Sequence, residues 1–148
     1  MTTKATRYQE IFKMAEAIVE GENDIISNMA NICALLHELN FLWTGFYRVD
    51  HESEQLVLGP FQGPVACSRI PYGKGVCGTA WKNKSTVIVP DVHQFPGHIA
   101  CSSQSNSEIV VPVFKGGEVT AVLDIDSTEF GTFDDIDKEW LERIVSLI

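Results

Sequence analysis

Residues 109–127 read IVVPVFKGGEVTAVLDIDS, and this stretch decides the fold. Two runs rich in apolar residues, 109–114 and 119–127, flank the segment Lys115-Gly116-Gly117-Glu118. A Gly-Gly pair between two such runs is typical of a β-hairpin turn. The stretch therefore predicts a β-hairpin within an antiparallel sheet.

The second run carries two carboxylates at alternate positions, Asp124 and Asp126. On a strand, residues i and i+2 share a face, so both carboxylates point one way while Leu123 and Ile125 point the other. Carboxylates in so apolar a strand cost free energy unless a cation or a hydrogen-bond donor meets them. The ammonium group of an amino acid would meet them; the alternative is a face open to solvent.

Glu108 directly precedes the first run, and its position depends on the register of the hairpin. A strict two-residue turn at Gly116-Gly117 places Glu108 opposite Ile125, on the other face from the aspartates. A register shifted by one residue brings Glu108 onto their face. Grouped acids raise the pKa of one member, which then supplies a proton near neutral pH. The sequence leaves both registers open.

The rest of the chain predicts helices at both ends and further strands between them. Apolar residues recur at helical spacing over residues 8–19, and Asn23 or Asp24 can cap a second helix. Asp134 or Asp135 can cap a final helix. Further predicted elements are strands over residues 41–49, 55–58 and 86–89, a short helix over 76–82, and a functional loop over 91–107. We therefore expect an α+β fold in a single domain over residues 1–148, with an antiparallel β-sheet flanked by N- and C-terminal helices.

The composition excludes several classes of partner. Acidic residues outnumber basic ones 20 to 11, and the net charge is −9, which disfavours nucleic acid and anionic lipid surfaces. No segment has the continuous apolar length of a membrane span, and the start of the chain lacks the apolar block of a signal peptide. We expect a cytoplasmic protein, in a compartment where thiols stay reduced.

Three of the four cysteines point to thiol chemistry. Cys67, Cys77 and Cys101 have Gly, Ser or Ala beside them, which suggests exposure, whereas Cys33 belongs to the apolar stripe of the second helix and is expected in the core. Cys77 falls in the first turn of the short helix, where the macrodipole favours a thiolate. His98, three residues before Cys101, is placed to influence that thiol if the loop turns there.

Two other interpretations of these cysteines stay open. They can be unreactive residues that happen to lie in loops, although three in one chain of this size argue against that. Cys67, Cys77, His98 and Cys101 also offer the right number and kind of ligands for zinc. However, no pair has the C-x2-C spacing of a zinc knuckle, so no metal is expected.

Six strings carry the most specific signal in the chain. They are WTGFY (43–47), LGPFQG (58–63), GVCGTA (75–80), GHIAC (97–101), SNSEIV (105–110) and LDIDS (123–127). Together they closely resemble the free methionine-(R)-sulfoxide reductases built on a single GAF domain. The resemblance implies a GAF-like fold and an oxidoreductase that converts free methionine (R)-sulfoxide into methionine.

The same resemblance implies a role for each of the three thiols. Cys101 matches the family's nucleophile, which attacks the sulfoxide sulfur and becomes a sulfenic acid. Cys67 matches the cysteine that resolves this sulfenic acid as an intramolecular disulfide. Cys77 matches an auxiliary thiol near the substrate. No bound cofactor is implied, because an external dithiol of the thioredoxin type reduces the disulfide again.

Acidic and aromatic residues are implied to bind the substrate. Glu108, Asp124 and Asp126 match the acids that hold the substrate ammonium group, and Glu108 and Asp126 are the expected proton donors. Trp43 matches the aromatic residue beside the S-methyl group, and Tyr47 is expected near it; taken alone, Trp43 is either core or an apolar wall for a ligand. The alternative function is a ligand-binding or redox-sensing GAF module that acts through a partner. The oligomeric state, monomer or homodimer, stays open.

Overall fold

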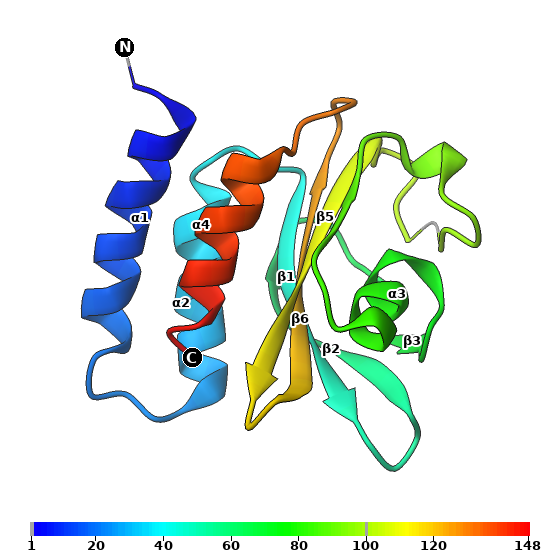
Figure 1. The fold of residues 1–148 in the computed structure, drawn as a ribbon, viewed down its shortest axis with the longest axis horizontal. Helices are drawn as coiled ribbons and strands as arrows, with labels where there is room; N and C mark the ends of the chain where they lie inside the picture. Colours follow the sequence, from blue (N-terminus) through cyan, green and yellow to red (C-terminus); the bar gives the residue numbers. More distant parts are fainter. Residues whose placement is uncertain (1, 100) are drawn as a thin grey trace.

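The structure, a computed structural model, describes residues 2–99 and 101–148. A six-stranded antiparallel sheet in the order β3-β2-β1-β6-β5-β4 separates two layers (Figure 1). This confirms the predicted α+β fold with an antiparallel sheet and flanking helices. The strands are β1 (Trp43–Asp50), β2 (Gln55–Gln62), β3 (Arg69–Pro71), β4 (Val87–Val89), β5 (Ser107–Lys115) and β6 (Glu118–Ser127).

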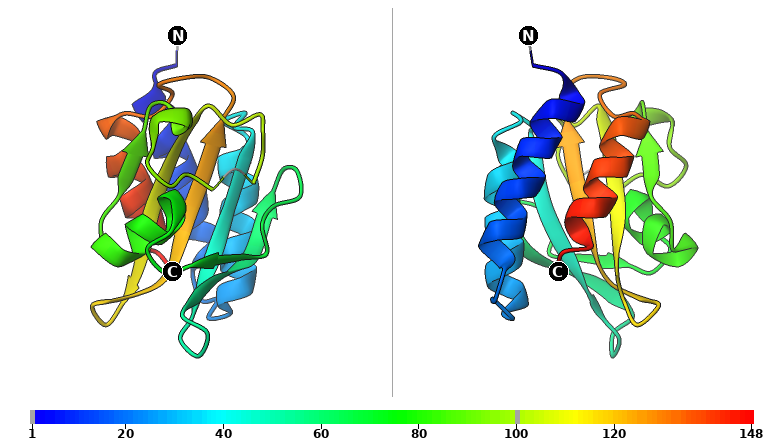
Figure 2. Two further views of the ribbon diagram at one scale, coloured as in Figure 1. Left: turned by 90° about the vertical axis from the view of Figure 1, so that its right-hand side faces the viewer. Right: turned by 60° about the vertical axis from the view of Figure 1, so that its left-hand side comes forward.

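Three helices cover one face of the sheet and a shorter one covers part of the other, as Figure 2 shows from two sides. The first face carries α1 (Lys4–Val19), α2 (Ile25–His37) and α4 (Asp135–Val145); the second carries α3 (Gly75–Asn83), followed later in the chain by a 3-10 turn, η1 (Val92–Gln94). No helix among the described residues is both long and apolar enough to cross a membrane.

Side-chain caps and one buried acid fix the terminal helices. Asp24 accepts a hydrogen bond from the Ser27 N–H at the start of α2, and Asp134 forms a capping box with Asp137 at the start of α4. Asp137 also accepts hydrogen bonds from the Tyr8 hydroxyl at 2.6 Å and from Lys4 at 2.8 Å. These contacts join α1 to α4, the two ends of the chain.

The helix-covered face holds the larger core. Alternate residues of β5 and β6, such as Ile109, Leu123 and Ile125, are fully buried against the three helices. Cys33 is buried among them, and its thiol donates to the carbonyl of Pro60 at 3.3 Å. Cys33 is a core residue, as its place in the apolar stripe predicted.

A β-bulge in the hairpin sets which residues share the opposite face. At the turn, Lys115 pairs with Glu118 and Phe114 with Val119, but Val113 then pairs with Ala121, which leaves Thr120 unpaired. The bulge shifts the register by one residue, so that Glu108 pairs with Asp126. Of the two registers that the sequence left open, the structure has the one with all three acids on the same face.

Two strand predictions were incomplete. β2 continues through Gly59 and Pro60 to Gln62, beyond the strand predicted over residues 55–58. β3 pairs only with residues 55–57 of β2, so the missing N–H of Pro60 breaks no hydrogen bond to β3. On the side of β1, a bulge opposite Phe46 accommodates Pro60. β3 itself is three residues long, too short to show a period.

Gly45 leaves the space in which the Trp43 indole lies. A Cβ atom at position 45 would overlap the Trp43 ring and the Cβ of Phe61. The Trp43 and Phe61 rings stack there with 5.2 Å between their centroids. The absence of a side chain at Gly45 therefore shapes the second face of the sheet.

We predict that Gly45→Ala lowers the free energy of unfolding by about 1–3 kcal/mol, because the added methyl group must displace an aromatic ring. Urea unfolding measures this. Thr44→Val is the matched control: Thr44 is buried on the other face, and its hydroxyl has no hydrogen-bond partner among the described residues. Replacing that hydroxyl with a methyl group should not destabilise the protein. An equal loss in both variants would contradict the steric explanation.

Candidate active site

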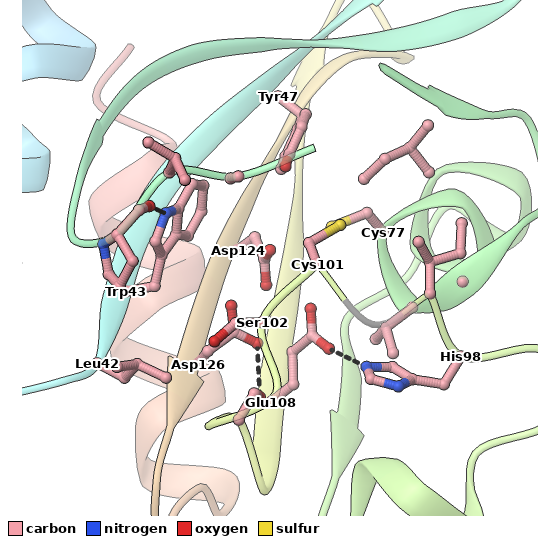
Figure 3. A pocket seen from close by; sticks show the side chains of 18 residues that line it. Leu42, Trp43, Tyr47, Cys77, His98, Cys101, Ser102, Glu108, Asp124 and Asp126 are labelled. Atoms are coloured by element: carbon pink, nitrogen blue, oxygen red, sulfur yellow. Dashed lines mark hydrogen bonds and ion pairs between the residues drawn. The ribbon is translucent and has the colours of Figure 1, made fainter. Parts of the chain in front are cut away.

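The face of the sheet opposite the three helices carries a pocket lined by both thiol and acid residues (Figure 3). Glu108 on β5 pairs with Asp126 on β6, and Val110 pairs with Asp124, which brings the three carboxylates together. The cavity that remains is about 40 Å³, room for a few water molecules. The predicted site residues that line it are Trp43, Tyr47, Cys77, Cys101, Glu108, Asp124 and Asp126.

Burial dominates the electrostatics of the three acids. Glu108 and Asp124 are each 6% exposed, so the prediction of a solvated face is excluded. Desolvation raises the pKa of all three carboxyls, and repulsion from Asp124 raises the pKa of Glu108 and of Asp126 further. No Lys or Arg is among the described residues that line the pocket. The group therefore retains a proton at pH values where exposed carboxyls are ionised.

Two neighbours orient this group. The Ser105 hydroxyl donates to Asp126 Oδ1 at 3.2 Å, and His98 Nε2 lies 3.8 Å from Glu108 Oε1. Burial lowers the pKa of His98, and nearby His93 lowers it further, whereas burial raises the pKa of Glu108. The pocket therefore disfavours the charged form of both partners in this contact. His98 thus approaches Glu108 in addition to being near Cys101 in sequence. Ser105 was not predicted, because a serine in an irregular loop gives no signal of its partner.

A disulfide bond joins Cys67 to Cys101, with 5.5 Å between their Cα atoms. This is the pairing that the family resemblance implies. Both residues are half-buried, and Cys101 lines the pocket whereas Cys67 does not. The Tyr47 hydroxyl donates to the carbonyl of Cys67 at 2.9 Å, and burial raises the pKa of Tyr47, so this hydroxyl keeps its proton. In this oxidation state Cys67 and Cys101 offer no thiolate, so the four-ligand zinc site considered for the sequence is not formed.

The expectations for Cys77 were wrong in two respects. Cys77 lies in the first turn of α3 as predicted, but it is only 3% exposed. Burial raises the pKa of its thiol well above the usual value, and the charges of Asp124 and Glu108 raise it further, which outweighs the helix macrodipole. The neighbouring glycine reflects close contact rather than exposure, since a Cβ at Gly78 would lie 2.7 Å from the Pro71 carbonyl oxygen.

Trp43 is both a core residue and a wall of the pocket. Its indole N–H donates to the carbonyl of Pro64 at 3.0 Å, and its ring stacks on Tyr47 with 5.9 Å between centroids. Only 5% of Trp43 is exposed. The two interpretations of Trp43 in the sequence are therefore compatible, because one ring face can line the pocket while the rest is buried.

The fold and site are those of a GAF domain, and the sequence pattern of the GAF domain matches residues 22–148. The chain is 46% identical to the free methionine-R-sulfoxide reductase of Escherichia coli over 145 residues, which cover 97% of this chain and 87% of that protein. The chain also superposes, with a TM-score of 0.97, on the structure of the free methionine-R-sulfoxide reductase from Neisseria meningitidis in complex with its substrate. The two sequences are 48% identical, and the match covers 99% of this chain and 89% of that one. The reduced form of the free methionine-R-sulfoxide reductase of Staphylococcus aureus superposes with a TM-score of 0.92. It is 49% identical, and the match covers 100% of this chain and 97% of that one. The chain belongs to the free methionine-R-sulfoxide reductase family of oxidoreductases.

The buried acids predict that stability falls as the pH rises. Glu108 and Asp126 have raised pKa values when folded, against about 4.5 and 3.8 when unfolded. Above those values the folded state binds more protons than the unfolded state, so raising the pH costs about 1.4 kcal/mol per pH unit for each proton retained. Urea unfolding of the disulfide form from about pH 5 to pH 7.5 measures the slope.

The control is the same series on Glu108→Gln, which removes one retained proton and should flatten the slope. His98, Asp124 and Cys77 face the same group, so the remaining slope reports on them together. An identical slope in wild type and variant would show that Glu108 is ionised in the folded protein.

Proposed function

We propose that this protein reduces free L-methionine (R)-sulfoxide to L-methionine. The observation that carries the proposal is the disulfide bond between Cys67 and Cys101, because Cys101 lines a pocket that also holds the three grouped acids. The similar proteins of Escherichia coli and Neisseria meningitidis are named for this activity, and the latter was solved with its substrate.

The proposed chemistry transfers one oxygen atom from the substrate to Cys101. The sulfur of Cys101 bonds to the sulfoxide sulfur while Glu108 or Asp126 protonates the oxygen, which is a poor leaving group until then. The protonated oxygen then passes to the Cys101 sulfur as a hydroxyl group while the bond between the two sulfurs breaks, so that methionine is released and Cys101 becomes a sulfenic acid. The Cys67 thiol then attacks that sulfur, which expels water and forms the disulfide before further oxidation occurs.

The proposed substrate contacts explain why a free amino acid is preferred. Asp124 Oδ1 is buried without a hydrogen-bond partner among the described residues, and an ammonium group would satisfy it together with Asp126. Trp43 and Tyr47 provide the aromatic wall for the S-methyl end. A peptide-bound methionine sulfoxide has an amide in place of the ammonium group and would leave Asp124 unpaired.

Recycling is proposed to need an external reductant and no bound cofactor. A thioredoxin-type dithiol would exchange with Cys67–Cys101, with Cys77 as an auxiliary thiol. This cycle fits a cytoplasmic protein, since the reducing compartment supplies the dithiol. We further propose that residues 1–148 form a single GAF domain, acting as a monomer or a homodimer.

We predict that the cysteines differ in a single-turnover assay of reduced protein without added reductant. Cys101→Ser should release no methionine from free methionine (R)-sulfoxide. Cys67→Ser should still release about one methionine per chain but fail to recycle with thioredoxin, because it makes the sulfenic acid without resolving it. Cys33→Ala is the matched control and should equal wild type. Release of methionine by Cys101→Ser would overturn the assignment of the nucleophile.

We predict that N-acetylation of the substrate lowers kcat/KM about ten- to a hundredfold, the usual loss for a charge-assisted hydrogen bond worth about 1.5–3 kcal/mol. Asp124→Asn should lower kcat/KM for the free substrate similarly and affect the N-acetyl substrate little. Asp135→Asn, at an exposed position in α4, is the control and should have no effect. Equal kcat/KM values for the two substrates in wild type would show that the ammonium group is not recognised.

A further inference from the structure

One thiol of the pocket remains free in the disulfide form, and it lies against two acids. Cys77 Sγ and one carboxylate oxygen each from Glu108 and Asp124 are all within 4.8 Å of one another. All three residues are buried, and they come from three different elements, α3, β5 and β6. Cys101 also lines the pocket, but it is bonded to Cys67, so neither of these two competes with Cys77 for a ligand.

The donor set is one that zinc accepts. A thiolate and carboxylate oxygens are both zinc ligands, and three protein ligands with one water complete a four-coordinate ion. The cavity of about 40 Å³ has room for an ion and a water molecule. No Lys or Arg among the described lining residues opposes a cation there. A divalent ion would also remove the repulsion among the buried acids.

A second observation points to a cation at the same place. Asp124 Oδ1 is buried and has no hydrogen-bond partner among the described residues, although a buried carboxylate oxygen normally has one. Asp124 is 6% exposed and, as Figure 3 shows, lies in the middle of the pocket between Tyr47 and Glu108. An unpaired acceptor in this position is expected to be satisfied by a positive ligand.

We infer that Cys77, Glu108 and Asp124 form a site for one thiophilic divalent cation of the zinc type in the disulfide form of the protein. Binding replaces the proton of the Cys77 thiol and the proton that the acid group retains; both leave to solvent as the bonds to the metal form, and no group is oxidised or reduced. This site shares only Cys77 with the cysteine-rich zinc site considered for the sequence.

The consequence for activity rests on the proposed function. If the substrate ammonium group binds Asp124, then metal and substrate use the same oxygen and exclude each other. The cation and methionine sulfoxide then compete for the pocket of the disulfide form, and a bound cation keeps the sulfoxide out of it. Metal binding itself does not depend on the reaction and can be tested in protein that turns nothing over.

The test titrates Co²⁺ into the disulfide form without added thiol and follows the sulfur-to-cobalt charge-transfer absorption. We expect one Co²⁺ per chain, displaced by one equivalent of Zn²⁺. Cys77→Ser should abolish the band, and Asp124→Asn should weaken Co²⁺ binding at least tenfold. Cys33→Ala, which removes the other free thiol, is the control and should leave the band unchanged.

No band in wild type, a band that Cys33→Ala removes, or an undiminished affinity in Asp124→Asn would overturn the site. Free methionine sulfoxide should in turn displace the Co²⁺ and remove the band. A band that persists at saturating sulfoxide would overturn the shared use of Asp124 and leave the metal site standing. A chain that binds Co²⁺ as expected but shows no reductase activity would contradict the proposed function alone.

Discussion

The register between β5 and β6 is the constraint on which the rest of the site depends. Thr120, the extra residue in the hairpin, places Glu108 opposite Asp126 instead of Ile125. Without that shift, Glu108 would enter the helix-covered core, where Ile109 and Leu123 are fully buried. One unpaired residue near the turn therefore decides which face carries the acid group, because side chains alternate strictly along a strand.

Burying the three acids lowers the free energy of unfolding, and the same burial gives them the raised pKa values that the reaction needs. Burial keeps a proton on carboxyls that would lose it in water, and the same burial keeps the Cys77 thiol protonated. Sulfoxide reduction needs both a thiol and a proton donor in one place. Cys101 lines that pocket, and its disulfide bond to Cys67 joins the loop before β5 to the loop before β3. The larger core and the reactive groups thus lie on opposite faces of one sheet.

Much of the fold could be predicted from the sequence because periodicity and capping are local signals. The helix starts at Asp24 and Asp134 and the hairpin around Gly116-Gly117 were of this kind. The shift at Thr120 could not be predicted, since a bulge leaves no mark in an apolar run, and three residues of β3 are too few for a period. The burial of Cys77 was missed for a related reason: small neighbours occur both in exposed loops and where a helix closely approaches a strand. The site residues were predicted from the six sequence strings that resemble the family. Those strings depend on the chemistry of the site rather than on local structure.

Carboxyl ¹³C NMR measures directly whether Glu108 or Asp126 retains a proton in the folded protein. Glutamate and aspartate labelled at the side-chain carboxyl would be followed through a pH titration of the disulfide form, with Glu108→Gln and Asp126→Asn used to assign the signals. At neutral pH at least one of these two carboxyls should still have the chemical shift of a protonated acid. Both signals moving to the ionised position near the ordinary pKa values of about 4.5 and 3.8 would contradict it.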